Sequence, residues 1–195
     1  MRPAPLTGPG ARLLLGVAGL VVSGMSIDHD HVGRPEEAVF RRVNELPDSL
    51  YRPAWLVMQV GTIGAVPVAA AVALATGRRL TARRVLQTGT ATWLVAKAVK
   101  RAYGRPRPAS LLATARCRGE AATGMGYVSG HAGISTTLAL SWWPELGPVG
   151  RWVALVVPPV VGATRVYVGA HLPLDVLGGV ALGMAVDGAT GLLTR

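Results

Sequence analysis

The chain has 195 residues, of which 50% are hydrophobic, and it contains one cysteine, Cys117. Lysine and arginine number 20 against 10 acidic residues, which gives a net charge of +10. This composition is typical of one domain that is not soluble, and a single cysteine excludes an internal disulfide. The basic residues lie at the ends of apolar segments and not along one polar face, which favours membrane topology over a nucleic-acid partner.

Six apolar segments approach the length of about 20 residues that a membrane span needs. They cover residues 11–27, 54–77, 85–100, 130–147, 149–164 and 172–193. We therefore predict an all-α, polytopic membrane helix bundle with about six transmembrane helices. It would form a single membrane-embedded domain over residues 1–195, with its core motifs in 100–175. The first segment has the alternative interpretation of a cleaved signal peptide, although it lacks a clear small-x-small cleavage site.

The first connection, residues 28–53, contains six of the ten acidic residues, which suits the outer side of a membrane. Within it, apolar residues at positions 39, 40, 43 and 46 have helical spacing. That pattern is typical of a helix on the membrane surface, or of a short solvated helix in a loop. The stretch DHDH at 28–31 has metal-ligating residue types but no further ligand cluster, so we interpret it as a solvated span end.

The connection after the second segment is strongly basic, and the positive-inside rule places it in the cytoplasm. Its arginines are Arg78, Arg79, Arg83 and Arg84. Alternation of the spans then places the third and fifth connections outside. Prolines at 67, 158 and 159 fall inside predicted spans, where they predict kinks because neighbouring helices satisfy the freed backbone groups.

The stretch KRAYGRPRP, residues 100–108, offers two different cations to an anion. Lys100 is a point charge and Arg107 is a planar fork, a combination suited to binding several phosphate oxygens. Taken alone, this basic run has the alternative of contacting anionic lipid headgroups.

The stretch YVSGHAG, residues 127–133, directly precedes an apolar run. Ser129 predicts a helix N-cap and Gly130 permits close backbone approach, so free N–H groups would face an anion within reach of His131. An ordinary serine cap followed by an interfacial histidine is the alternative for this motif alone.

The stretch TRVYVGAHLPLDVLGG, residues 164–179, keeps Arg165, His171 and Asp175 in an apolar segment. His171 and Asp175 are four residues apart and share a helix face if the helix has begun by then. An aspartate that accepts from one imidazole nitrogen fixes the tautomer and leaves the other nitrogen free to attack. A role at the helix N-terminus would also explain Asp175, but not the arginine and histidine beside it.

The three motifs fall on the third and fifth connections, which face the same compartment because two spans separate them. We therefore expect the arginines of the third connection to form a phosphate site, and we do not interpret them as a signal for the cytoplasmic side. They are Arg101, Arg105, Arg107, Arg116 and Arg118.

With these motifs the chain resembles the type 2 phosphatidic acid phosphatase family, in its integral-membrane lipid phosphatase branch. The matching residues are Lys100-x6-Arg107-Pro108, Ser129-Gly130-His131 and Arg165-x5-His171-x3-Asp175. Val128 stands where the family has proline, which removes a backbone constraint from the phosphate loop. Thr164 stands where the family has serine and keeps the hydroxyl. The predicted spans disfavour the soluble haloperoxidases that share the signature.

The resemblance implies a role for each residue. His171 would attack phosphorus to give a phosphohistidine, Asp175 would orient it, and His131 would protonate the leaving oxygen and then activate water. The phosphate oxygens would be bound by Lys100, Arg107, Ser129, the Gly130 amide and Arg165. Because these cations would do what magnesium does in other phosphoryl-transfer sites, we expect neither a metal nor a cofactor.

The predicted function is hydrolysis of a lipid phosphate or polyprenyl pyrophosphate, with an undecaprenyl-type lipid favoured. The site would face the extracytoplasmic side of a bacterial cytoplasmic membrane. One alternative is a phosphotransferase with an acceptor other than water, and another is a non-catalytic lipid-binding or transport protein. A membrane lipid is the expected partner, and the sequence specifies neither the lipid tail nor the oligomeric state.

Overall fold

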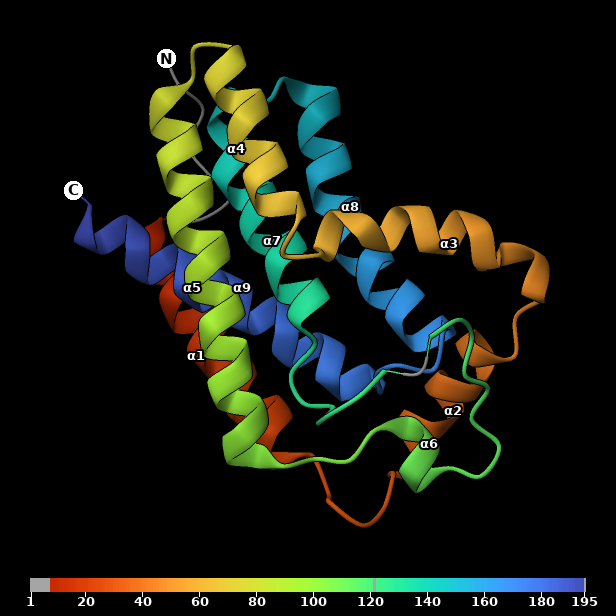
Figure 1. Cartoon of the computed structure of the whole chain (residues 1–195). Coiled ribbons are helices and arrows are strands. Elements are labelled where there is room, and N and C mark those ends of the chain that lie inside the picture. Colours follow the sequence, from red (N-terminus) through yellow and green to blue (C-terminus); the bar gives the residue numbers. More distant parts are fainter. Residues whose placement is uncertain (1–7, 121, 195) are drawn as a thin grey trace.

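The computed structural model describes residues 8–120 and 122–194, and within these ranges the chain is helical without strands. The longer helices are α1 (Pro9–Met25), α5 (Arg79–Tyr103), α7 (Gly130–Trp142), α8 (Pro148–Tyr167) and α9 (Pro173–Leu193). The shorter ones are α2 (Arg34–Asn44), α3 (Tyr51–Met58), α4 (Ala65–Ala75) and α6 (Pro108–Leu111). Helices α4, α5, α7 and α8 stand side by side, while α1 and α9 pack together and cross them at an angle (Figure 1). The prediction of an all-α membrane bundle is confirmed.

The segment predicted as one span over 54–77 is broken into two. The helical stretches Asp48–Gly61 and Ala65–Ala75 meet at a bend of 68°, and α3 lies across the direction of α4 (Figure 1). Pro67 therefore lies in the first turn of a new helix, where the missing N–H costs little, and the predicted kink in a continuous span is wrong. Pro158 and Pro159 do lie inside a continuous helix, α8, as predicted.

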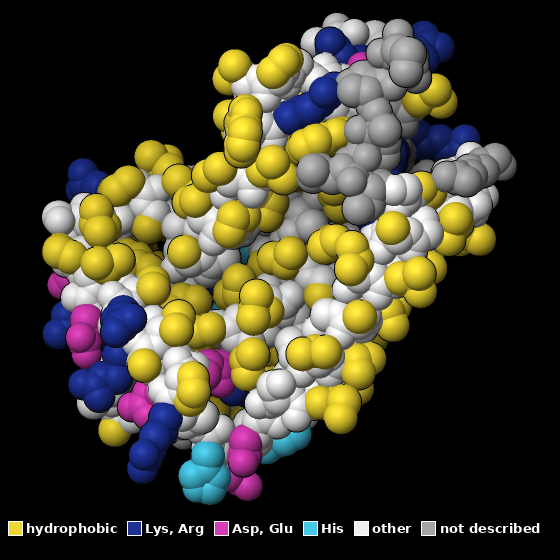
Figure 2. Space-filling view, turned by 180° about the vertical axis from the view of Figure 1, so that it is seen from behind, with side chains coloured by type: hydrophobic (Ala, Val, Ile, Leu, Met, Phe, Trp, Pro, Cys, Tyr) yellow, Lys and Arg dark blue, Asp and Glu magenta, His cyan; other side chains and the backbone are white. Residues whose placement is uncertain are grey.

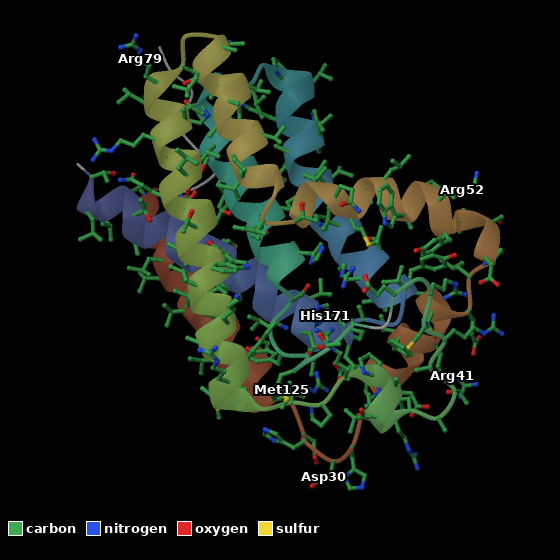
Figure 3. All side chains as sticks on the ribbon, in the orientation of Figure 1. Asp30, Arg41, Arg52, Arg79, Met125 and His171 are labelled. Carbon is green, nitrogen blue, oxygen red and sulfur yellow. The ribbon has the colours of Figure 1, made fainter. Side chains whose placement is uncertain are left out.

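The bundle has an apolar flank and polar ends. Among the described residues, α8 and α9 are each long and apolar enough to cross a membrane, and the bent pair counts as a third crossing if it forms one span. Hydrophobic side chains cover the flank, whereas acidic and histidine side chains gather toward one end (Figure 2). Arg79 and Asp30 mark opposite ends, with His171 nearer to Asp30 (Figure 3).

The helix expected in the first connection is present as α2, and it is docked on the bundle. Phe40 and Asn44 on this helix are buried. The Asn44 side-chain amide donates to the carbonyl oxygens of Arg116 and Tyr167, at 2.9 Å each, and its oxygen accepts from the Arg116 N–H at 2.8 Å. Helix α2 therefore holds the third connection against the end of α8.

Glycines bring α7 and α9 into backbone contact. A Cβ on Gly179 would lie 2.3 Å from the Ser129 carbonyl oxygen, and one on Gly183 would lie 2.6 Å from the Gly133 carbonyl oxygen. Small residues are typical of helix interfaces in membranes, because they let backbones approach closely. This approach holds Ser129 and the start of α7 against the first turns of α9.

We expect Gly179→Ala to lower the melting temperature of the protein in detergent, since overpacking costs about 1–3 kcal/mol. Gly10→Ala is the matched control, because a Cβ at Gly10 meets no atom within 4 Å and alanine is the better helix former. Thermal unfolding followed by circular dichroism measures both variants. Equal melting temperatures for the two variants would contradict the close contact.

Candidate active site

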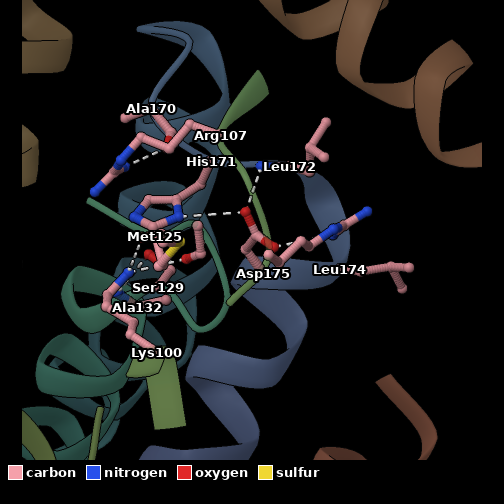
Figure 4. Close-up of polar contacts among 12 residues, drawn as sticks. Lys100, Arg107, Met125, Ser129, Ala132, Ala170, His171, Leu172, Leu174 and Asp175 are labelled. Carbon is pink, nitrogen blue, oxygen red and sulfur yellow. Dashed lines mark hydrogen bonds and ion pairs between the residues drawn. The ribbon is translucent and has the colours of Figure 1, made fainter. Parts of the chain in front are cut away.

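Predicted site residues from four parts of the chain converge on a cavity of about 390 Å³. They come from the end of α5, the loop before α6, the start of α7 and the end of α8 with the connection to α9. Six of the eight predicted site residues line it: Lys100, Arg107, Gly130, His131, Arg165 and His171. Figure 4 shows the His171 ring surrounded by the side chains of Arg107, Lys100 and Asp175.

Asp175 lies behind His171 and is completely buried. Its Oδ2 lies 3.4 Å from His171 Nδ1 and accepts the Leu172 N–H at 2.9 Å. Helix α9 begins only at Pro173, so the condition under which His171 would share a helix face with Asp175 is not met. The two side chains meet instead because Asp175, in the first turn, reaches back over the N-terminus of its helix.

His171 is held as a neutral imidazole. Burial, followed by the positive charges of Lys100, Arg107 and Arg165, lowers the pKa of His171 well below its ordinary value. The ring is therefore uncharged at pH 7 and becomes protonated only as the pH falls toward that lowered pKa. With Nδ1 turned toward Asp175, Nε2 is the nitrogen that carries a lone pair into the cavity.

The cations at the cavity wall also hold the third connection. Lys100 Nζ donates to the Met125 and Gly126 carbonyl oxygens at 2.8 and 2.9 Å. The Arg107 guanidinium donates to the carbonyl oxygens of Thr123, Gly124 and Ala170, the last at 2.6 Å. These bonds keep two positive charges beside His171.

Arg165 is less engaged than the other two cations. Its Nη1 lies 3.1 Å from the Met58 sulfur, and its buried Nε has no hydrogen-bond partner in the described part of the chain. A guanidinium in such surroundings retains donors for an anion.

The serine and glycine of the second motif open α7 as predicted. Ser129 is the N-cap residue, and its Oγ accepts the Ala132 N–H at 3.5 Å. Its own N–H donates to the Asp175 carbonyl oxygen at 2.7 Å. Ser129 is fully buried beside the cavity and does not line it, whereas Gly130 and His131 present the helix N-terminus to it.

The sequence analysis missed an ion pair behind the site, between Arg105 and Glu36. Arg105 is fully buried and places its guanidinium between Asp175 and Glu36, a residue of α2. The expectation that Arg105 belongs to a phosphate site is wrong for this reason: it does not line the cavity. The sequence signals were a short RPRP run and two acidic residues in the first turn of a helix. Neither signal indicates that the two segments contact each other.

Arg118 is likewise used to hold the fold. It donates to the Asp48 carboxylate at 2.7 Å and to the carbonyl oxygens of Asn44, Leu46 and Tyr167. It lines a second cavity of about 440 Å³, which shares only Thr123 and Arg165 with the first. We expected the arginines of the third connection to form the phosphate site together. Of these arginines, Arg107 alone lines the first cavity.

This bundle, with a buried histidine facing a cationic cavity, is that of a membrane phosphatase. A sequence model of the PAP2 superfamily matches residues 81–193, more than half of the chain, and includes all three motifs. The protein belongs to the PAP2 superfamily, which confirms the family predicted from the motifs.

Solved structures share its fold. LpxE from Aquifex aeolicus superimposes with a TM-score of 0.71 at 21% sequence identity, covering 80% of this chain and 93% of that one. The first transmembrane PAP2-type phosphatidylglycerolphosphate phosphatase from Bacillus subtilis also gives 0.71, at 19% identity and 95% coverage of both chains. No curated protein matches the sequence.

Proposed function

We propose that the protein removes phosphate from a membrane lipid phosphate or polyprenyl pyrophosphate, an undecaprenyl-type lipid being favoured, through a phosphohistidine intermediate. The observation that carries the proposal is the convergence of His171 and His131 with Lys100, Arg107 and Arg165 on one cavity. Two imidazoles can attack and protonate, while three cations can bind the phosphate oxygens.

In the proposed reaction, His171 Nε2 attacks phosphorus and the bond to the leaving oxygen breaks. His131 protonates that oxygen and then takes a proton from the water that hydrolyses the phosphohistidine. Asp175 holds the His171 tautomer and stabilises the charge that develops on the ring. The cations stabilise the phosphoryl oxygens in the transition state, so we expect no metal requirement.

The apolar part of the cavity wall supports a lipid substrate. It is formed by Trp93 on α5, Ile63 before α4 and Ile134 on α7. Lys97 lies at the same wall, with its Nζ 3.6 Å from the centre of the Trp93 ring. An apolar wall with a cation beside it suits a substrate with a hydrocarbon tail and an anionic head.

The orientation of the bundle supports a site on the extracytoplasmic side. The basic connection that contains Arg79 lies at the end away from His171 (Figure 3), and the positive-inside rule assigns such a connection to the cytoplasm. A carrier lipid that is recycled at the outer face of a bacterial cytoplasmic membrane would meet the site there. We therefore expect undecaprenyl-type pyrophosphate to be a better substrate than phosphatidic acid or phosphatidylglycerol phosphate.

The test is phosphate release by the purified protein in detergent micelles, with undecaprenyl pyrophosphate, phosphatidic acid and phosphatidylglycerol phosphate as separate substrates. We expect release from at least one of them, fastest from the pyrophosphate, and an unchanged rate after dialysis against EDTA. Loss of activity with EDTA and recovery with magnesium would refute the metal-independent mechanism. Absence of release from all three lipids would refute the proposed function.

A further inference from the structure

We propose that Glu36 and Arg105 are positioning residues for the phosphatase reaction, which act on His171 through Asp175. They form a continuous chain of charged side chains that runs from α2 to the nucleophile. The inference rests on the proposed function, because it takes His171 as the group that attacks phosphorus.

Arg105 is fixed on both sides of its guanidinium. On one side, Nη1 and Nη2 donate to Glu36 Oε1 and Oε2 at 3.1 and 2.7 Å. On the other side, Nη1 donates to Asp175 Oδ1 at 2.9 Å. The Arg105 carbonyl oxygen also accepts the Gly126 N–H at 2.8 Å. The arginine is therefore locked to the carboxylate that faces the nucleophile, and to the loop whose carbonyl oxygens hold Lys100.

Both oxygens of Asp175 have assigned partners as a result. Oδ1 accepts from Arg105, while Oδ2 faces His171 Nδ1 and accepts the Leu172 N–H. A carboxylate bound at both oxygens cannot rotate without breaking a charge-assisted bond. Arg105 thus determines which oxygen of Asp175 is presented to the imidazole.

Glu36 anchors the chain from outside the α8–α9 hairpin. Its Oε1 accepts the Leu174 N–H at 2.9 Å as well as the Arg105 bond. The N–H of Leu174 belongs to the first turn of α9, whose donors lack partners within the helix. Glu36 therefore sets the position of Arg105 relative to the same helix turn that carries Asp175.

The buried charges of Asp175, Arg105 and Glu36 stabilise one another. Asp175 is completely buried, and a buried carboxylate needs a paired cation. Burial alone would lower the pKa of Arg105, but the hydrogen bonds and charges of Glu36 and Asp175 outweigh it and raise that pKa. Arg105 thus stays cationic while it is shared between two carboxylates.

The test uses Glu36→Gln, which keeps the size of the side chain. The substitution removes the negative charge and places an amide N–H donor against the N–H donors of the guanidinium. We expect kcat on the best lipid substrate to fall about tenfold to a hundredfold, as displaced catalytic groups do, while KM stays within about twofold. Glu37→Gln is the matched control, because Glu37 is the next residue of α2 and forms a surface ion pair with Arg41 at 3.8 Å, away from Arg105 and Asp175. We expect it to leave both constants unchanged.

A structural role is separated from a positioning role by two further measurements. The melting temperature in detergent should be similar for Glu36→Gln and Glu37→Gln. Arg105→Lys, which keeps the positive charge but loses the planar guanidinium, should retain part of the activity. Adding Glu36→Gln to Arg105→Lys should lower kcat by a smaller factor than Glu36→Gln does alone, because the effects of coupled residues are not additive.

The outcomes for the two proposals differ. Three results would overturn the positioning role while wild-type activity stands. They are an unchanged kcat in Glu36→Gln, a kcat loss matched by a fall in melting temperature, and additive losses in the double variant. A wild-type protein that releases no phosphate from any lipid of the panel overturns the proposed function instead.

Discussion

Replacement of His171 by alanine should lower phosphate release from the best lipid substrate by a factor of about 10⁴ or more, as the loss of an enzyme nucleophile does. The reason is that no other described side chain places a nitrogen lone pair at the same point of the cavity with a carboxylate behind it. Substrate binding should persist, because Lys100, Arg107 and Arg165 remain. The measurement is a steady-state rate together with lipid binding by the inactive variant.

The matched control is His31→Ala. His31 is a histidine of the first connection, with 84% of its side chain exposed, and its replacement should leave the rate unchanged. A His171→Ala protein that hydrolyses every lipid at the wild-type rate would exclude His171 as the nucleophile. If wild type and variant both bind lipid without hydrolysing it, the lipid-binding alternative is correct.

Replacement of His131 by alanine should reduce turnover by about 10²- to 10⁴-fold, the usual contribution of a general acid and base. Pyrophosphate has a good leaving group, so the first step should survive better than the second, which needs a base for water. Phosphohistidine should therefore accumulate in His131→Ala. Incubation with a lipid pyrophosphate labelled at its terminal phosphate, followed by an alkaline detergent quench, would trap it on the protein.

The control for this experiment is the double variant His131→Ala/His171→Ala, which should carry no label. Label that persists in the double variant would show that the phosphoryl group is bound elsewhere. Turnover at the wild-type rate in His131→Ala would remove His131 from the proton transfers. Labelled product on an acceptor other than water, formed by the wild type, would favour the phosphotransferase alternative.

The sequence was sufficient for the features that depend on short stretches of chain. Ser129 was predicted as an N-cap, and α7 begins at the next residue, because a serine that bonds to the backbone three residues on is a local signal. The all-helical membrane class followed from apolar segments of helical length. The family followed from motifs whose internal spacing reflects loops and helix starts, and the match over 81–193 confirms it. The catalytic roles of the matching residues stay predictions.

The tertiary structure decided what the long-range contacts determine. Local pattern did not show that the second span breaks, with α3 lying across α4, because apolar composition continues through the bend at 62–64. The pattern also left open whether the last helix has begun at His171, which precedes α9. Arg105 and Glu36 are 69 positions apart, and only packing of α2 against the start of α9 makes them partners. The sequence of a basic loop does not show whether its arginines contact phosphate, lipid or a buried carboxylate. The fold determines which oxygens each guanidinium contacts.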